Sequence, residues 1–290
     1  MNPKVSVCII TYNHERYIER CLLSILNQEV NFEFEIIVGE DCSTDSTREI
    51  ISRMLSEYPD VIKPMFKEKN LGGYKNYISV HEEARGKYIC HIDGDDYMLP
   101  GKLQKCVDVL DSRPEIGIVF HRMMLDYGNG KIKLDPLDTQ RMGQCDFEQK
   151  DILAIGSIAC HSSRMYRSNL RVDKYPEVFL DYYIDVIQTK ASKAHIINEP
   201  LGGYSVGVGV ASVGTTKFLY MEHLKDFLED IPEYSGYIGS NMLTVLLSDV
   251  KNRRCSTVKI RDILDCGLIG SMLNFLKYLK FRRYINVPKL

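Results

Sequence analysis

The chain has 290 residues, 44% of them hydrophobic and 26% charged, with a formal net charge of −2. These values are ordinary for a globular protein with one large domain, alone or with an extension, and they exclude a largely disordered chain. The near-zero charge argues against a nucleic-acid partner held by a broad basic surface. The sequence has no apolar run of membrane-spanning length, no signal-peptide pattern at its start and no cysteines at metal-ligand spacing. We therefore expect a cytoplasmic protein with reduced thiols.

Short apolar stretches alternate with amphipathic ones through the first hundred residues. The apolar stretches predict strands over 5–10, 34–38, 61–66 and 88–92. Helical spacing predicts helices after Asn13, after Ser46 and over 74–84, with Asn13 and Ser46 as N-terminal caps. This alternation predicts an α/β fold, in which a mostly parallel sheet carries helices on both faces.

Polar residues follow each of the four predicted strands, at 11–13, 40–41, 70–72 and 93–95. Open α/β sheets bind their ligands at the carboxyl ends of the strands, and these four clusters all lie at that edge. The first strand is not followed by a dinucleotide-binding Gly-x-Gly-x-x-Gly, and no phosphate-binding Gly-x-x-x-x-Gly-Lys occurs. Neither of those nucleotide-binding classes is therefore indicated.

The fourth strand runs directly into Asp93-Gly94-Asp95-Asp96. Carboxylates this close repel one another unless a cation lies among them. An Asp-x-Asp at a strand end suits Mg²⁺ or Mn²⁺, which take one or two carboxylates and complete their coordination with phosphates and water. The alternative for this motif alone is a solvated acidic turn.

The second half of the chain gives weaker signals. The pattern predicts a helix after Pro100, a strand over 116–120, a hairpin over 123–134, a helix over 145–155, a strand over 158–167, a helix over 179–194 and a strand over 195–197. From residue 215 onward the pattern is helical.

Four motifs in order carry a resemblance to a known family. They are Val5-Ser6-Val7-Cys8-Ile9-Ile10-Thr11-Tyr12-Asn13, Ile36-Ile37-Val38-Gly39-Glu40-Asp41-Cys42-Ser43-Thr44-Asp45, Asn70-Leu71-Gly72, and Gly86-Lys87-Tyr88-Ile89 with Asp93-Gly94-Asp95-Asp96 and Pro100-x-Lys102-Leu103. Over roughly residues 4–213 the chain resembles the inverting family 2 glycosyltransferases of the GT-A fold. The resemblance implies a glycosyltransferase domain over 1–214, with a nucleotide-binding half over 1–100 and an acceptor half over 101–214. Residues 215–290 would form a C-terminal helical extension.

The resemblance also implies residues that bind the donor. In this sequence Thr11 and Tyr12 would flank the nucleotide base, usually uridine, and Asp41 would accept the imide N–H of that base. Asn70 would lie near the nucleotide. Capping of a helix is the alternative for Asp45, whereas Asp41 lies too early in the sequence to cap the helix that follows it.

Asp93 and Asp95 match the family's Asp-x-Asp metal motif. Asp95 would be a direct ligand of Mn²⁺ or Mg²⁺, and Asp93 would lie near both the ribose and the metal. Asp96 would either contact the donor sugar or cap the next helix. A bound divalent ion stabilises the negative charge that develops on the leaving nucleoside diphosphate.

The family's general base is the Asp of a Glu-Asp-aromatic motif that opens a helix. Here Leu180-Asp181-Tyr182 occupies that place, so the resemblance implies Asp181 as the base of a single inverting displacement. The Glu of the motif is replaced by Leu180. Asp185 is the competing candidate, and an exposed helix charge is the alternative for either aspartate.

In the family, one segment helps to close the site over the donor diphosphate, and this chain departs from the family pattern there. The family often has Tyr-Arg-x-His there, whereas this chain has Tyr204-Ser205-Val206-Gly207. His161 or Arg164 are the candidates to substitute in space, with an ordinary structural role as the alternative.

The C-terminal segment has no acidic residue after Asp265, while basic residues accumulate. An apolar helix face beside Lys277 and Lys280 suits peripheral binding to an anionic membrane, where lipid-linked acceptors reside. A helix packed on the catalytic domain is the alternative.

Three functions follow from these observations. The first is a metal-dependent transferase that moves a sugar from a nucleotide-sugar donor, with a UDP-sugar favoured, to a saccharide or lipid-linked saccharide. The resemblance implies a role in bacterial capsule, O-antigen or exopolysaccharide assembly, in the cytoplasm or at the inner face of the membrane. The second is a sugar-phosphate nucleotidyltransferase, which would need a glycine-rich basic loop where the chain has Thr11-Tyr12-Asn13-His14. The third is a catalytically silent relative that acts as a nucleotide- or saccharide-binding scaffold.

Overall fold

The computed structural model describes residues 3–208 and 216–284. Its strands are β1 (Val5–Thr11), β2 (Phe34–Glu40), β3 (Ile62–Phe66), β4 (Tyr88–Asp93), β5 (Tyr97–Met98), β6 (Ile116–Asp126), β7 (Ile132–Leu134), β8 (Asp146–Phe147), β9 (Met165–Arg167) and β10 (Lys193–Ser205). Its helices are α1 (Ile18–Leu26), α2 (Thr47–Glu57), α3 (Gly73–Glu83), α4 (Lys102–Ser112), α5 (Thr139–Met142), α6 (Gln149–Ile155), α7 (Asp181–Gln188), α8 (Thr216–Asp230), α9 (Ser235–Lys251), α10 (Ile260–Asp265) and α11 (Leu268–Tyr278).

The chain forms two compact units. The first unit comprises residues 1–135, 160–173 and 194–209, and the second comprises 136–159, 174–193 and 210–290. The predicted boundary at 214/215 lies outside the described residues. The units are interleaved in sequence, because two segments before residue 194 belong to the second unit.

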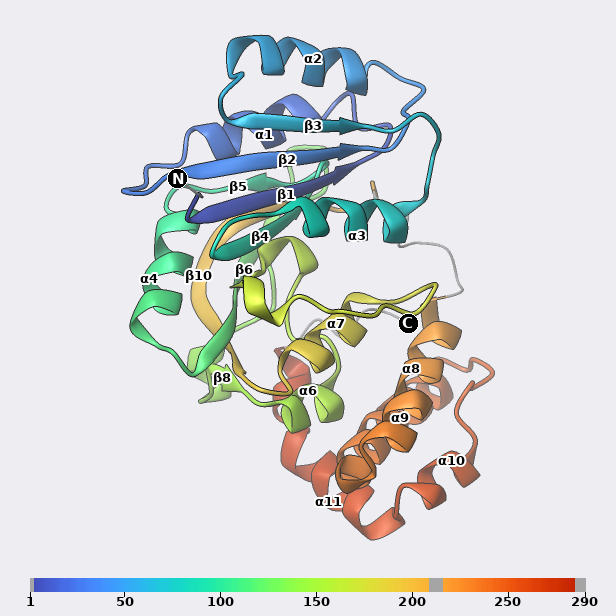
Figure 1. The fold of residues 1–290 in the computed structure, drawn as a ribbon. Coiled ribbons are helices and arrows are strands. Elements are labelled where there is room, and N and C mark those ends of the chain that lie inside the picture. The colour runs from blue at the N-terminus through green and yellow to red at the C-terminus, as the bar shows by residue number, and fades with distance from the viewer. Residues whose placement is uncertain (1–2, 209–215, 285–290) are drawn as a thin grey trace. The chain divides into compact units, whose positions relative to one another are not determined.

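The first unit is built on a mixed sheet with the strand order β3-β2-β1-β4-β9-β6-β10-β5. Figure 1 shows β3, β2, β1 and β4 side by side. The strands β3, β2, β1 and β4 run parallel, as the alternation of strands and helices predicts. The short β9 lies antiparallel between β4 and β6, and β5 pairs antiparallel with β10. The predicted α/β class with a mostly parallel sheet is therefore confirmed at its N-terminal half.

Helices cover both faces of this sheet. On one face Val5, Val7 and Ile9 of β1 share a buried core with α1, α2 and α4. On the other face α3 lies against β1 and β2, and the Cys8 Sγ contacts the Val80 carbonyl. Each central strand is apolar on both faces, which explains its nearly continuous hydrophobic sequence.

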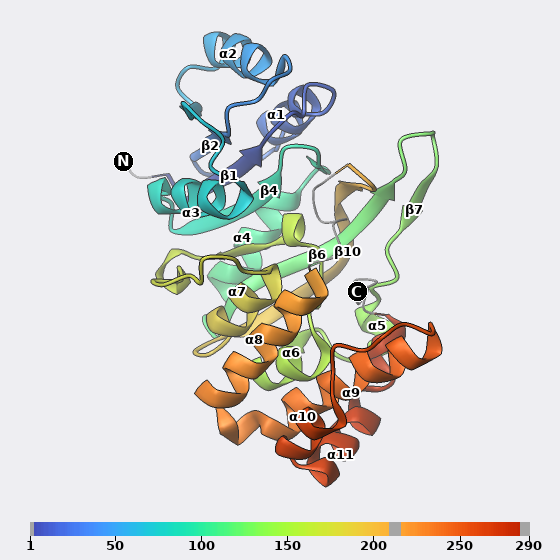
Figure 2. The same ribbon diagram turned by 90° about the vertical axis from the view of Figure 1, so that its right-hand side faces the viewer.

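The second unit is mainly helical. Figure 2 shows its C-terminal helices gathered together, with α9 packed against α6 and α11. The Asn241 amide of α9 donates to the Leu153 carbonyl of α6, 2.8 Å away, and so fixes α9 on α6. Among the described residues, no helix combines the length and the apolar character needed to cross a bilayer.

Three local predictions were wrong. Asn13 has a φ of 56° and does not cap α1, which begins only at Ile18. Ser46 stands at the N-cap of α2, but the capping bond predicted for its side chain is absent, and the Asp45 carboxylate accepts from the Thr47 N–H instead, at 3.0 Å. The expected strand over 158–167 is a 3₁₀ turn at 161–163 followed by the short β9.

Candidate active site

The ends of β1, β2 and β4 meet at the carboxyl edge of the sheet in the first unit. The register pairs Thr11 with Glu40 and Ile10 with Asp93. Just past the paired residues of these strands, the Asp41 N–H donates to the Thr11 carbonyl at 3.1 Å, and the Gly94 N–H donates to the Ile10 carbonyl at 2.9 Å. Three of the four predicted polar clusters are thus joined through the backbone.

Gly94 permits the close approach of the acidic loop, residues 93–96, to β1. A Cβ at this position would lie 2.6 Å from the Thr11 Oγ1 and 2.7 Å from the Thr11 Cβ. Real Cβ atoms are not found at such distances, so a side chain here would push the loop away from β1. The glycine within the acidic motif is therefore required by packing.

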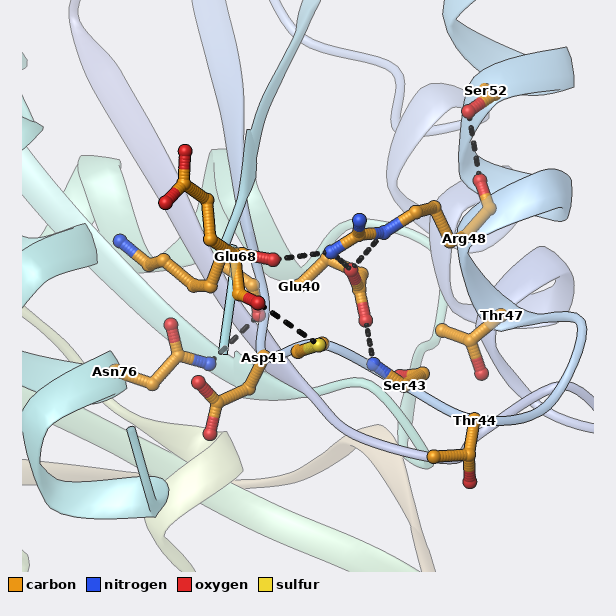
Figure 3. Close-up of polar contacts among 12 residues, drawn as sticks. Glu40, Asp41, Ser43, Thr44, Thr47, Arg48, Ser52, Glu68 and Asn76 are labelled. Carbon is orange, nitrogen blue, oxygen red and sulfur yellow. Dashed lines mark hydrogen bonds and ion pairs between the residues drawn. The ribbon is translucent and has the colours of Figure 1, made fainter. Parts of the chain in front are cut away.

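The side chains of Glu40 and Asp41 point away from each other at the end of β2 (Figure 3). Glu40 is fully buried, and its carboxylate accepts from the Arg48 Nε and the Ser43 N–H, both at 2.6 Å. It therefore fixes the loop that follows β2. The Asp41 carboxylate accepts from the N–H groups of Leu71 and Gly72, at 2.8 and 2.9 Å.

This arrangement gives Asp41 a structural role that the sequence did not indicate. It holds the turn before α3 rather than capping the helix after its own strand, and so brings the fourth polar cluster to the same edge. The Asn70 side chain is exposed, and its Oδ1 accepts from the Gly72 N–H. Tyr12 is 39% exposed, whereas Thr11 is buried with its Oγ1 3.2 Å from the His14 Nδ1.

The three carboxylates of the acidic loop, which together form the acidic cluster, lie close enough to hold one cation. One oxygen from each of Asp93, Asp95 and Asp96 falls within 4.8 Å of the others. Burial and the neighbouring charge of Asp93 raise the pKa of Asp95 to about 7. Burial and the charges of both neighbours raise the pKa of Asp96 well above its ordinary value.

The donor set of this cluster fits a hard divalent ion. Asp96 is fully buried, its Oδ1 accepts from the Ser205 N–H, and its Oδ2 has no partner among the described residues. A buried carboxylate oxygen without a donor is costly unless a cation or a ligand satisfies it. Carboxylate oxygens are the ligands that Mg²⁺ and Mn²⁺ prefer.

Asp96 does not cap the helix that follows it. That helix, α4, begins at Lys102 with Gly101 at its N-cap and no side-chain cap bond. Of the two roles expected for Asp96, helix capping is therefore excluded, and its carboxylate belongs to the acidic cluster.

Asp93 is held from both sides. Its Oδ1 lies 3.2 Å from the His91 Nε2, and its Oδ2 accepts from the Ser162 Oγ at 3.3 Å. The His91 Nδ1 lies 3.0 Å from the Nε2 of His81, and burial lowers the pKa of both histidines. His91 and Ser162 thus fix the orientation of the Asp93 carboxylate at the start of the acidic loop.

Ser205 occupies the place of the family's arginine and anchors the acidic loop. Its N–H donates to the Asp96 Oδ1 at 2.9 Å, and its Oγ donates to the Asp95 carbonyl at 2.5 Å. The Arg20 Nη2 donates to the same Oγ at 3.0 Å, while its Nη1 pairs with Asp126. Ser205 and Arg20 of α1 thus hold the loop together.

His161 and Arg164 both belong to the first unit, at the 3₁₀ turn that precedes β9. Arg164 is fully buried, with its guanidinium 5.4 Å from the centre of the Tyr166 ring. The His161 ring lies 4.2 Å from the His91 ring, and its Nδ1 is 3.3 Å from the Arg164 Nη1. Arg164 is thus a buried structural residue, whereas His161 is only partly buried.

Asp181 belongs to the second unit, where it is the first residue of α7. Its side chain is exposed, whereas the competing Asp185 is 2% exposed. An exposed carboxylate can accept a proton from a hydroxyl that approaches from solvent. The structure therefore favours Asp181 over Asp185 as the accessible carboxylate of α7.

Sequence analysis missed three residues that shape the acidic loop: Ser162, Ser205 and Arg20. They reach Asp93, Asp95 and Asp96 across 69 to 110 positions of sequence. Serine and arginine at these positions match no local motif. The departure from the family pattern at 204–207 was the one available signal.

Comparisons with known proteins agree with this fold. The family model described as "Glycosyl transferase family 2" matches residues 6–171, which is more than half of the chain. An uncharacterized protein of Mycobacterium tuberculosis is 31% identical over 205 residues, which cover 69% of this chain and 58% of that protein. An uncharacterized glycosyltransferase of Nostoc sp. is 32% identical over 176 residues, which cover 60% of this chain and 53% of that protein. The chain thus spans a little over half the length of these relatives.

Solved structures share the fold at low identity. Staphylococcus aureus TarS 1–349 superposes on 97% of this chain and 82% of its own, with a TM-score of 0.66 and 19% identity. TarS has been solved with UDP and with UDP-GlcNAc. A mannosyltransferase of Pyrobaculum calidifontis in complex with GDP-Man and Mn²⁺ covers 97% of this chain and 84% of its own, with a TM-score of 0.62 and 16% identity.

Proposed function

The chain belongs to glycosyl transferase family 2, and from this premise we propose that it is a metal-dependent inverting glycosyltransferase. Its donor is a nucleotide-sugar, with a UDP-sugar favoured, and the transferred group is a hexose or an N-acetylhexosamine. Its acceptor is a saccharide or a lipid-linked saccharide in the synthesis of a bacterial cell-surface polysaccharide. Support for the donor comes from solved neighbours that bind UDP, UDP-GlcNAc and GDP-Man.

The acidic cluster is the observation that carries this proposal. Three carboxylates share one loop at the carboxyl edge of a mostly parallel sheet, where such sheets bind ligands. The pKa values of Asp95 and Asp96 are raised, and the buried Asp96 Oδ2 has no hydrogen-bond donor among the described residues. A bound cation would therefore stabilise the ionised form of this loop.

In this proposal Asp95 and Asp93 hold Mn²⁺ or Mg²⁺. The ion, when bound, stabilises the negative charge of the departing nucleoside diphosphate. Thr11 and Tyr12 contact the nucleotide base, with Tyr12 offering an exposed aromatic face.

Three further side chains complete the donor site in this proposal. Asp41 has both oxygens engaged by backbone N–H groups, so its orientation is fixed before it accepts from the base. Asn70 lies beside the same turn, near the nucleotide, and Asp96 orients the donor sugar from within the acidic cluster.

Asp181 is the general base in this proposal. An acceptor hydroxyl is a poor nucleophile, and a carboxylate that takes its proton during attack lowers the barrier. A single displacement with one base inverts the configuration at the anomeric carbon. The first residue of a helix is a favourable place for a carboxylate that must stay ionised, because the helix N-terminus carries partial positive charge.

Turnover separates this enzyme from a silent scaffold. The test incubates the full chain with UDP-, GDP- and dTDP-sugars and Mn²⁺, with and without a lipid extract as acceptor source, and measures release of the nucleoside diphosphate. Release from one nucleotide class that depends on Mn²⁺ and rises with the extract would support transfer. Tight nucleotide binding without release in any mixture would favour the scaffold.

The exposed face of α11 supports a membrane location for the acceptor. Six large apolar side chains of this helix region are 45–76% exposed: Leu268, Ile269, Met272, Leu273, Leu276 and Leu279. The opposite face, with Ser271 and Tyr278, is buried. Patches of this kind mark interaction surfaces, because a helix that is apolar all round is normally covered.

We propose that this face rests on an anionic lipid surface. Lys277 lies in the last turn of α11, Lys280 and Arg283 follow in sequence, and no acidic residue lies between 266 and 284. Their cations can reach phosphate headgroups while the leucines enter the acyl boundary. A second copy of the chain fits less well, because a two-fold contact would bring the same lysines together.

Vesicle flotation tests the membrane contact. We expect binding to vesicles that contain phosphatidylglycerol, weaker binding to pure phosphatidylcholine, and loss of binding in Leu273→Glu with Leu276→Glu. The matched control is Ile132→Glu with Leu134→Glu, which changes two exposed apolar residues of β7. Equal binding by both double variants, or a dimer that only the α11 variant abolishes, would contradict the lipid assignment.

A further inference from the structure

Two buried histidines link the acidic loop to the interior of the first unit. His81 on α3 is 1% exposed and His91 on β4 is fully buried. Their surroundings leave no room for solvent to satisfy the ring nitrogens, so each nitrogen must find its partner within the fold. Sequence analysis assigned no role to either residue.

The contacts form one continuous series. The Tyr166 hydroxyl lies 2.7 Å from the His81 Nδ1, and the His81 Nε2 lies 3.0 Å from the His91 Nδ1. The His91 Nε2 lies 3.2 Å from the Asp93 Oδ1. Three hydrogen bonds thus connect the tyrosine of β9 to the first carboxylate of the acidic motif.

The chemistry of the last partner fixes the direction of every bond. An ionised carboxylate only accepts hydrogen bonds, so the His91 Nε2 must carry the proton. The His91 Nδ1 is then an acceptor, and the His81 Nε2 must carry a proton that it donates to it. The His81 Nδ1 is in turn an acceptor for the Tyr166 O–H. One arrangement of neutral rings satisfies all four groups.

We propose that His91 and His81 are positioning residues that hold Asp93 in the orientation needed for the ion and the ribose. The proposal rests on the proposed function. His91 anchors one carboxylate oxygen while the Ser162 hydroxyl anchors the other. His81 acts one step further back, because it keeps His91 in the tautomer whose N–H faces Asp93. Partners of this kind govern metal affinity in characterised sites.

A purely structural role is the competing explanation, since the rings also pack together. The Tyr77 ring stacks on His81 at 3.9 Å between centres, and His161 lies 4.2 Å from His91. Packing predicts that each substitution lowers stability and that any loss of binding follows stability. We call the hydrogen-bonded series from Tyr166 through His81 and His91 to Asp93 the relay. If the relay positions Asp93, the loss of Mn²⁺ affinity should become smaller with each further hydrogen bond between the substituted residue and Asp93.

The test measures Mn²⁺ affinity in the presence of UDP, by titration calorimetry, alongside thermal unfolding of the free protein. We expect His91→Phe to weaken Mn²⁺ binding about 10–100-fold, His81→Phe less, and Tyr166→Phe by less than about threefold. His91→Gln should recover most of the affinity, because its amide nitrogen can donate to Asp93 from nearly the same point as Nε2.

His121→Phe is the matched control. His121 is a fully buried histidine of β6 that lies outside the relay, and its Nε2 has no partner among the described residues. This variant should bind Mn²⁺ and UDP as the unchanged protein does. An affinity within twofold of the unchanged protein in His91→Phe, or equal losses in His91→Phe and His121→Phe, would overturn the proposal.

A second readout does not depend on nucleotide binding. Nitrogen NMR of the free protein distinguishes the two neutral tautomers of histidine, and the relay requires the proton on Nε2 in both His81 and His91. A proton on the Nδ1 of His91 would refute the relay whatever the protein binds. Failure of the unchanged protein to bind UDP, GDP or dTDP with Mn²⁺, together with the expected tautomers, would refute the proposed function and leave the relay as a property of the fold.

Discussion

The two compact units depart from the usual distribution of side chains in opposite ways. The first unit buries charge, since Asp95 and Asp96 are at most 5% exposed within one loop. The second unit exposes apolar surface on α11 and the carboxylate of Asp181 at the start of α7. Buried charge and exposed apolar patches are the informative exceptions in a folded protein. We propose that a divalent ion stabilises the buried charge of the first unit and that a lipid surface covers the apolar patch of the second.

The largest effect should come from the exposed carboxylate of the second unit. Asp181→Asn should lower kcat about 10²–10⁴-fold, because it removes the proton acceptor, and should leave nucleotide affinity unchanged. The assay is release of the nucleoside diphosphate under saturating donor. Glu177→Gln, an exposed acid close in sequence, is the control. Equal activity in both variants would show that the base lies elsewhere.

The buried charge of the first unit should make stability depend on pH. Asp95 has its pKa raised to about 7, above the ordinary value near 3.8, so the folded state holds this proton more tightly than the unfolded state. With metal chelated, stability should therefore fall as pH rises from about 4 to about 7. Thermal unfolding of the unchanged protein and of Asp95→Asn checks this, since the variant lacks that titration. If the stability of the two proteins changed with pH in the same way, titration of the buried Asp95 would not be the cause.

The close packing of the acidic loop should tolerate no side chain at Gly94. Gly94→Ala should destabilise the free protein by about 1–3 kcal/mol, because its Cβ would overlap Thr11. Denaturant unfolding measures the free-energy change. Gly143→Ala offers a control at a turn where a Cβ would meet no atom within 4 Å, although its φ of 70° adds strain. A smaller loss at position 94 than at 143 would show that the loop is not tightly packed.

The smallest effect should follow the loss of one hydroxyl at the acidic loop. Ser205→Ala removes the bond to the Asp95 carbonyl and should cost about 1 kcal/mol of stability. Mn²⁺-dependent nucleotide binding should weaken with it, since the loop loses an anchor. Ser52→Ala, which removes an exposed hydroxyl bonded to the Arg48 carbonyl on α2, should change neither property. Equal results for the two serines would leave Ser205 without a role at the loop.

Sequence reasoning predicted the features that depend on local pattern. The strands and helices of the first hundred residues, and the meeting of their polar ends, follow from hydrophobic periodicity and from the geometry of parallel sheets. The family was also recognised from motifs, and its fold is confirmed. The acidic cluster is predictable because Asp93, Asp95 and Asp96 are adjacent in sequence.

The remaining features depend on contacts between distant segments. Ser205 reaches the Asp95 carbonyl across 110 positions, and Ser162 reaches Asp93 across 69. His81 and His91 are close in sequence, but their alignment depends on how α3 packs beside β4. Asp41 turned out to hold a turn 30 residues away, which a search for local caps could not find. No periodicity or spacing encodes such contacts.

The central claim is that the acidic cluster binds a divalent ion together with a nucleotide. Thermal unfolding with UDP, GDP, dTDP and CMP, each with and without Mn²⁺, tests it most directly on the unchanged protein and on Asp95→Asn. Nucleotide at about a hundred times its dissociation constant adds about 2.7 kcal/mol, which raises the unfolding temperature by at least about 2 °C at this size. We expect a rise with UDP that requires Mn²⁺ and is absent in Asp95→Asn. A rise that is equal in both proteins, or no rise with any nucleotide, would contradict it.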